Sequence, residues 1–183
     1  LTPVDEFHTG GREATAAFAE QAGFAAGQHL LDVGCGIGGP SRFFARELGC
    51  RVTGIDLTED YVRTAEALSR RVGLDAQVSY RQASAVALPF ADAAFDGAYM
   101  IHVGMNIADK AALFAGVRRV LKPGGTFALF DIMKTADGEL RYPVPWAAGR
   151  ETSFVASPTE YRRALEAAGF AIASERDRRT FAT

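Results

Sequence analysis

The chain has 183 residues and a formal net charge of −2, with 20 lysine and arginine residues against 22 aspartate and glutamate residues. This length suits a single domain, and the mild charge, without a run of basic residues, argues against nucleic acid or an anionic membrane surface as a partner. No apolar stretch approaches the ~20 residues that span a bilayer, and the first residues do not resemble a signal peptide.

Helices and strands are expected to alternate along the chain. Apolar residues at helical spacing, with glycine or capping residues at the ends, predict helices at 12–22, 40–48, 59–72, 110–121 and 158–168. Apolar or alternating runs predict strands at 29–33, 51–56, 76–82, 95–101, 126–132 and 170–178. The run 126–132 is nearly all apolar, which is typical of a strand buried on both faces. The alternation predicts an α/β fold with a doubly wound, mostly parallel sheet and helices on both faces.

A glycine-rich turn after the first strand is the most informative stretch. Residues 30–39 read LLDVGCGIGG, so an apolar strand passes through Asp32 into four glycines within six positions. Glycine lets the backbone approach a ligand closely, and N–H groups at the start of the next helix point into the same space. Asp56 ends the following strand, where a ribose-binding acid belongs. Together these features predict a nucleotide-like ligand.

Two classes of nucleotide fit this turn. Gly34, Gly36 and Gly39 satisfy the spacing G-x-G-x-x-G, which favours a dinucleotide and an NAD-dependent oxidoreductase. Asp32 favours S-adenosylmethionine instead, because a carboxylate repels a pyrophosphate but stabilises a sulfonium and an ammonium group. Asp32 has an alternative interpretation, in which it only braces the turn.

Four motifs together resemble the class I S-adenosylmethionine-dependent methyltransferases. They lie at 31–39, at 54–56, at 88–90 with 95–96, and at 121–125 (LKPGG), and together they cover residues 29 to 132. A narrower similarity to sarcosine/dimethylglycine and ubiquinone-biosynthesis methyltransferases rests on residues 5–8 and 102–107. The resemblance implies a Rossmann-like fold and in-line transfer of a methyl group from S-adenosyl-L-methionine to N, O or C of a small molecule, which leaves S-adenosyl-L-homocysteine. A non-catalytic regulator that binds the same cofactor is the alternative.

The resemblance also implies roles for individual residues. The glycines of the turn would pass beneath the methionine and ribose parts of the cofactor, and Asp32 would lie near its amino group. Asp56 would accept both ribose hydroxyls, and Leu57 would lie against adenine. Ser84 stands where the family often has an acid for the adenine amino group. The expected cofactor-binding residues are Asp32, Gly34, Cys35, Gly36, Gly38, Asp56, Leu57, Ser84, Ala85 and Ile101.

His102 is the candidate general base. It follows the fourth strand, at the carboxyl edge where such sheets bind ligands, and imidazole can take a proton near neutral pH. Alternatively, it lines the pocket or contacts the cofactor through its backbone. His8 and His29 are interpreted as non-catalytic. The expected acceptor-binding residues are His102, Met105, Asp131, Tyr142 and Trp146.

We expect one domain with four parts. Residues 1–28 form an N-terminal arm and helix, 29–133 the cofactor-binding core, 134–157 a substrate cap or lid, and 158–183 a C-terminal helix and strand. Such a long aperiodic connection is usually a lid, a binding loop or a disordered segment. In the cap, Tyr142, Trp146 and Phe154 either form an aromatic wall for the acceptor or fold the connection onto the sheet.

Other features set the expected context. Cys35 and Cys50 lack metal-ligand spacing, so reduced thiols, a cytoplasmic location and no metal site are expected. The chain starts at Leu1 rather than at methionine, which suggests a fragment of a longer protein. If a last antiparallel strand of the family's sheet is missing, a sheet edge is exposed. The partner is a small-molecule methyl acceptor that the sequence does not identify.

Overall fold

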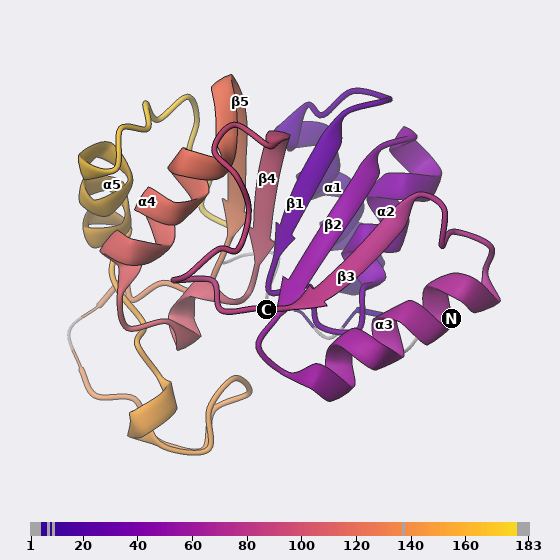
Figure 1. Cartoon of the computed structure of the whole chain (residues 1–183). Coiled ribbons are helices and arrows are strands. Elements are labelled where there is room, and N and C mark those ends of the chain that lie inside the picture. Colours follow the sequence, from indigo (N-terminus) through magenta and orange to yellow (C-terminus); the bar gives the residue numbers. More distant parts are fainter. Residues whose placement is uncertain (1–4, 7, 9, 137, 179–183) are drawn as a thin grey trace.

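A five-stranded parallel sheet organises the chain. The computed structural model describes residues 5, 6, 8, 10–136 and 138–178. The strand order is β3-β2-β1-β4-β5, so the order reverses between β1 and β4 (Figure 1). The strands are β1 His29–Val33, β2 Arg51–Asp56, β3 Val78–Gln82, β4 Phe95–Ile101 and β5 Leu121–Phe130. All pairings within this sheet are parallel, so the carboxyl ends of its strands share one edge, and the predicted fold class is confirmed.

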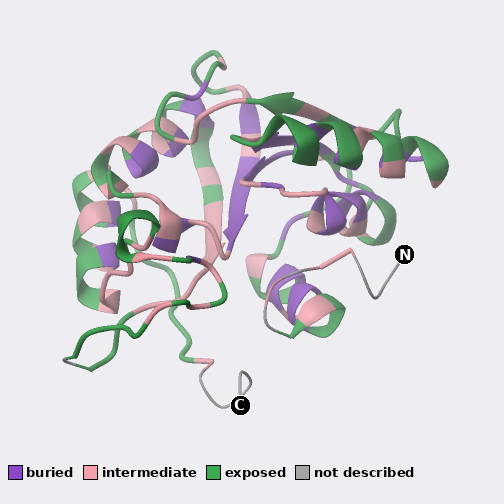
Figure 2. Cartoon of the chain, turned by 90° about the horizontal axis from the view of Figure 1, so that it is seen from below, coloured by how far each residue is buried: buried purple, intermediate pink, exposed green. Residues whose placement is uncertain are grey.

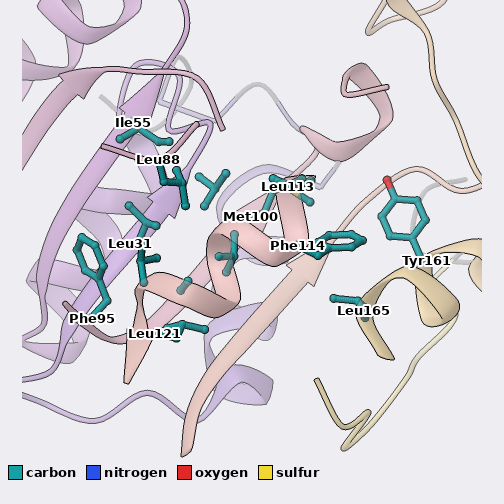
Figure 3. Close-up of a cluster of buried hydrophobic side chains, with 14 residues drawn as sticks. Leu31, Ile55, Leu88, Phe95, Met100, Leu113, Phe114, Leu121, Tyr161 and Leu165 are labelled. Carbon is teal, nitrogen blue, oxygen red and sulfur yellow. The ribbon is translucent and has the colours of Figure 1, made fainter. Parts of the chain in front are cut away.

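Helices cover both faces of the sheet. They are α1 Gly11–Ala22, α2 Gly39–Leu48, α3 Glu59–Arg71, α4 Lys110–Val120 and α5 Pro158–Ala167, with single 3-10 turns η1 Gly104–Asn106 and η2 Arg150–Thr152. Adjacent residues of β1 point to opposite faces. Leu30 belongs to a buried cluster with Phe18 of α1 and Phe44 of α2, whereas Leu31 belongs to a second buried cluster on the side of α4 and α5. Figure 2 shows the buried strands between these layers, and Figure 3 the core beneath α4 and α5.

Local signals explain the ends of several helices. The α5 helix begins with a complete capping box, in which Ser157 Oγ accepts from the Glu160 N–H and the Glu160 carboxylate accepts from the Ser157 N–H. Asp109 caps α4 by accepting from the Ala112 N–H at 2.8 Å.

Within the described residues, no helix is long and apolar enough to cross a membrane.

The prediction that the strand β5 is buried on both faces is wrong. Residues 127–130 are half-buried rather than buried on both faces, because β5 is the edge strand of the described sheet. Residues 122–125, which lie between the predicted helix and the predicted strand, belong to the strand as an irregularity. Phe95 pairs with Leu121 and Gly97 with Thr126, so the intervening residues of β5 have no partner in the register.

The strand predicted at 170–178 is also wrong. The structure has no strand in this segment. Phe170 packs against Phe127 with ring centroids 5.6 Å apart, but Ile172 is 38% exposed. The segment then becomes charged from Glu175 onward, so it lacks an apolar face that pairing could bury.

Candidate active site

The glycine turn lies at the carboxyl end of β1 and is tied to β2. The N–H groups of Gly34 and Cys35 both donate to the Ile55 carbonyl, at 2.9 and 2.8 Å. Gly34, Gly36 and Gly38 have φ values of 78°, 52° and 80°, a region that L side chains disfavour. The predicted tight turn is therefore present, and backbone conformation explains why glycine occupies these positions.

Only one of these three glycines also faces open space. A Cβ on Gly34 would lie 2.4 Å from a methyl carbon of Val103, and one on Gly38 would lie 2.4 Å from the Tyr80 hydroxyl. By contrast, no atom lies within 4 Å of a Cβ position on Gly36. The backbone at Gly36 is thus the part of the turn that a ligand can approach.

Asp56 connects the end of β2 to this turn. Its Oδ2 accepts from the Gly36 N–H at 2.9 Å, and its Oδ1 accepts from the Thr58 N–H at 2.9 Å. A carboxylate oxygen can accept more than one hydrogen bond, so both oxygens retain capacity for ligand hydroxyls. The next residue, Leu57, is 71% exposed, the highest exposure among the large apolar side chains described. An acidic group and an apolar surface therefore stand side by side at this edge.

Asp32 lies beneath the glycine turn and not in the open space beside Gly36. Its side chain is buried, and its Oδ2 accepts from Ser41 Oγ at 2.6 Å and from the Tyr99 hydroxyl at 3.0 Å. Burial raises the pKa of Asp32 to about 7, although the two hydrogen bonds oppose this shift. These contacts join β1, α2 and β4 and match the bracing interpretation.

The other residues expected around the cofactor have mainly local contacts. Ser84 Oγ accepts from the Val86 N–H at 3.4 Å, and Ala85 packs on the core. Ile101 ends β4 opposite Phe130 of β5. Cys35 is buried, and burial raises the pKa of its thiol, so it fills space and does not act as a nucleophile.

His102 has an unusual backbone and an unused nitrogen. Its φ is +53°, and its N–H donates to the Phe130 carbonyl at 2.7 Å. A non-glycine residue in this conformation costs about 1–3 kcal/mol and is typical of functional sites. Its Nε2 is buried and has no hydrogen-bond partner among the described residues. Burial lowers the pKa of His102 to about 4, so the ring is neutral at pH 7.

The N-terminal arm brings a second histidine to this place, which sequence reasoning missed. His8 Nε2 lies 2.8 Å from Glu6 Oε2 and 2.9 Å from Thr15 Oγ1, and its ring centroid is 5.7 Å from that of His102. Asp5 also anchors the arm through an ion pair with Arg42 of α2 at 2.6 Å. The signal in the sequence was the similarity over residues 5–8, which did not indicate a contact with the end of β4.

The cap, residues 134–157, is held by the segment that follows β4. Asn106 Nδ2 donates to the carbonyls of Trp146 and Thr152, at 2.9 and 2.8 Å. Lys110 Nζ donates to the Phe154 carbonyl at 2.9 Å, and the Phe154 N–H donates to the Met105 carbonyl at 2.7 Å. The cap is thus fastened to residues 105–110, below the carboxyl edge of the sheet (Figure 1).

The predicted acceptor-binding residues are only partly brought together. Trp146 donates from Nε1 to Ser153 Oγ at 3.1 Å, and no aromatic ring contact joins it to Tyr142 or Phe154 in the part of the chain that the structure describes.

Asp131 follows β5 and accepts from the Tyr161 hydroxyl at 2.5 Å and from the Ile132 N–H at 2.9 Å. Tyr161 lies at the rim of the core in Figure 3. Burial raises the pKa of Asp131 to about 6. The contacts of its carboxylate support the segment after β5, so the carboxylate does not face open space.

Comparisons with known proteins place this chain in a family. The sequence model of the family described as "Methyltransferase domain" matches residues 31–129, more than half of the chain. A sterol 24-C-methyltransferase of Eremothecium gossypii is 34% identical over 87% of this chain and 44% of that protein. The chain thus spans about half the length of the curated relatives it matches.

Solved structures agree with this match. Phosphoethanolamine N-methyltransferase 2 of Haemonchus contortus, in complex with S-adenosyl-L-methionine, has a TM-score of 0.82 at 26% identity, covering 91% of this chain and 39% of that one. The [4+2]-cyclase SpnF has a TM-score of 0.78 at 30% identity, covering 88% of this chain and 57% of that one. The chain belongs to the methyltransferase domain family, whose cofactor is S-adenosyl-L-methionine.

Proposed function

We propose that this chain binds S-adenosyl-L-methionine at the carboxyl edge of its sheet and methylates a small molecule. The arrangement of Gly36, Asp56 and Leu57 carries this proposal. Gly36 offers open backbone, Asp56 offers carboxylate oxygens beside it, and Leu57 offers an uncovered apolar surface. A ligand with a ribose between a flat base and a polar tail matches that order of groups, and the residues present therefore fit the cofactor.

Each residue has a distinct role in this proposal. Asp56 accepts the ribose hydroxyls while it holds Gly36, and Leu57 and Ser84 contact the base. Asp32 acts indirectly, because its bond to Ser41 fixes the start of α2 against β1. Gly34, Cys35, Gly38, Ala85 and Ile101 contribute backbone and shape. Above its pKa of about 7, an ionised Asp32 beneath the turn also makes the electrostatic potential favourable for a cationic tail.

The chemistry asks the protein mainly for positioning. When bound, the cofactor supplies an electrophilic methyl group. As the methyl carbon forms a bond to the acceptor, its bond to sulfur breaks and the electron pair of that bond stays on sulfur. Orienting two reactants is worth about 7–11 kcal/mol of a barrier. The unpartnered Nε2 of His102 can take a proton that the acceptor loses, although its lowered pKa makes it a weak base. The cap and the arm exclude water and select the acceptor, with Met105, Tyr142 and Trp146 on the cap side.

A turnover assay tests this proposal. The chain is incubated with S-adenosyl-L-methionine and a panel of small alcohols, phenols, amines and prenyl or sterol compounds, and S-adenosyl-L-homocysteine is quantified. We expect acceptor-dependent formation of this product, and a His102→Ala variant that loses about 100-fold in kcat if His102 is the base. Cofactor binding without any product would instead support the regulator, and NAD binding without cofactor binding would contradict the proposal.

A further inference from the structure

Three aromatic rings meet where the arm crosses the ends of β4 and β5. The ring centroids of His102 and Phe130 lie 4.6 Å apart, and those of His8 and His102 lie 5.7 Å apart. His8 also contacts Phe130 edge to face at 6.5 Å. Edge-to-face pairs at these separations are favourable and restrict ring orientation. The orientation of the His102 ring is therefore restricted by two neighbouring rings, Phe130 of the sheet and His8 of the arm.

The arm holds His8 through two polar groups. The side chains of His8 and Glu6 are only 6% and 3% exposed, and Thr15 of α1 is fully buried. Thr15 also contacts Glu6, so the carboxylate, the hydroxyl and His8 Nε2 form a closed triangle. A carboxylate oxygen accepts hydrogen bonds, so an Nε2–H of His8 would point toward Glu6. The two contacts of Nε2 restrict the orientation of the His8 ring.

We propose that His8 is a positioning residue for His102: Glu6 and Thr15 orient His8, and the His8 ring holds the imidazole of His102 so that its Nε2 stays available to the methyl acceptor. The inference rests on the proposed function and adds three residues to it. The orphaned Nε2 and the φ of +53° at His102 are its independent support, since strain and an unsatisfied buried nitrogen persist only where the surroundings enforce them.

The protein offers a matched control for the contacts that link Thr15, Glu6, His8 and His102. His29 Nε2 lies 2.9 Å from Thr53 Oγ1, the same distance and atom pair as in His8 and Thr15. His29 opens β1 at the amino edge of the sheet, at the opposite end of the strand from the glycine turn. Thr15→Val and Thr53→Val remove the same hydrogen bond, one within the proposed chain of contacts and one far from it.

Nuclear magnetic resonance of the imidazole carbon and proton signals tests the proposal, because the protein has only three histidines. Spectra are recorded with and without S-adenosyl-L-homocysteine as the probe. We expect Thr15→Val and Glu6→Gln to shift the signals of both His8 and His102 and to leave His29 unchanged. Thr53→Val should shift His29 alone. In the wild type, S-adenosyl-L-homocysteine should shift His102 and leave His29 in place.

Two substitutions of His8 separate ring packing from other effects. His8→Ala should move the His102 signals, whereas His8→Phe, which keeps a ring at this place, should leave them close to wild type. With any acceptor that is turned over, Glu6→Gln should lower kcat about tenfold, a part of the ~10²–10⁴-fold effect of a general base, with the KM for S-adenosyl-L-methionine unchanged.

Cofactor binding and the positioning role of His8 can fail independently. If S-adenosyl-L-homocysteine does not bind the wild type, the proposed function is wrong. If it binds but the His102 signals are the same in wild type, Thr15→Val, Glu6→Gln and His8→Ala, the positioning role of His8 is wrong. Thr15→Val keeps the shape of the side chain, so it answers the question even if His8→Ala does not fold.

Discussion

The Oδ2 atom of Asp56 accepts a 2.9 Å hydrogen bond from the Gly36 N–H. This bond joins the end of β2 to the turn after β1, so the acid and the open part of the turn keep a fixed separation. The same carboxylate also holds the Thr58 N–H at the start of α3. The site is therefore preorganised by its own residues, and ligand binding does not have to order them.

Alanine at Gly36 and at Gly34 should have different consequences. Gly36→Ala meets no atom, so its cost is limited to about 1–2 kcal/mol for the left-handed backbone, but the new methyl group occupies the space proposed for the cofactor. We expect a folded protein with S-adenosyl-L-homocysteine affinity reduced at least about tenfold, or 1.4 kcal/mol. Chemical denaturation and calorimetric titration measure the two effects.

Gly34→Ala should instead lose mainly stability, because its Cβ collides with Val103. The double variant Gly34→Ala with Val103→Ala provides the control, since it removes the two closest contacts while the backbone strain remains. We expect part of the lost stability to return, as a non-additive coupling in a double-mutant cycle. Strict additivity would show that Val103 does not limit the space at Gly34.

The raised pKa of Asp32 predicts a pH dependence of stability. With a folded pKa of about 7 against an ordinary 3.8, the folded state binds more protons than the unfolded state between those values. Stability therefore falls as pH rises from about 4 to 7, by at most about 4 kcal/mol for a shift of three pKa units. Asp32→Asn removes this titration and should flatten the slope.

Unfolding free energies of wild type and Asp32→Asn at pH 5 and pH 7 measure this effect. Asp131, whose pKa is also raised, contributes in the same direction, but it is present in both proteins and cancels in the difference. Equal slopes for the two proteins would mean that Asp32 is already ionised at pH 5 in the fold.

Asn106 should control the cap. Asn106→Ala removes the donors to the carbonyls of Trp146 and Thr152, two hydrogen bonds worth about 0.5–1.5 kcal/mol each. We expect faster trypsin cleavage after Arg150 in the cap, with S-adenosyl-L-homocysteine affinity unchanged, because the residues proposed to bind the cofactor lie outside the cap.

Ser157→Ala is the matched control for this variant. It breaks the capping box of α5 directly after the cap and costs about 1 kcal/mol, but it leaves both Asn106 bonds in place. Cleavage after Arg150 that is equally fast in Ser157→Ala and Asn106→Ala would attribute the effect to general destabilisation and not to the cap anchor.

Local patterns were enough to predict the elements that form the proposed cofactor site. The strands β1, β2 and β4 have the predicted bounds because each is an apolar run ended by a polar residue or a turn. The turn and Asp56 could be placed because the spacing of glycines and the strand-end acid are local features. The α5 helix followed from its capping box in the same way.

Features that depend on distant neighbours could not be predicted. The apolar run in β5 does not reveal that its outer edge is unpaired among the described residues, and residues 170–178 lack an apolar face despite Phe170 and Ile172. The hydrogen-bond partners of Asp32 come from α2 and β4. The contact of His8 with His102 joins the N-terminal arm to the residue that follows β4. Such contacts arise from packing and leave no periodic signal.

Calorimetric titration of wild type and Asp56→Ala with S-adenosyl-L-homocysteine, and of wild type with NAD, tests the central claim most directly. We predict that the wild type binds S-adenosyl-L-homocysteine and not NAD. Asp56→Ala should bind at least about tenfold more weakly, because hydrogen bonds to a charged group contribute about 1.5–3 kcal/mol. An exposed acid outside the site, Asp92, gives the control Asp92→Ala with unchanged affinity. Equal affinities of wild type and Asp56→Ala, or binding of NAD alone, would contradict the account.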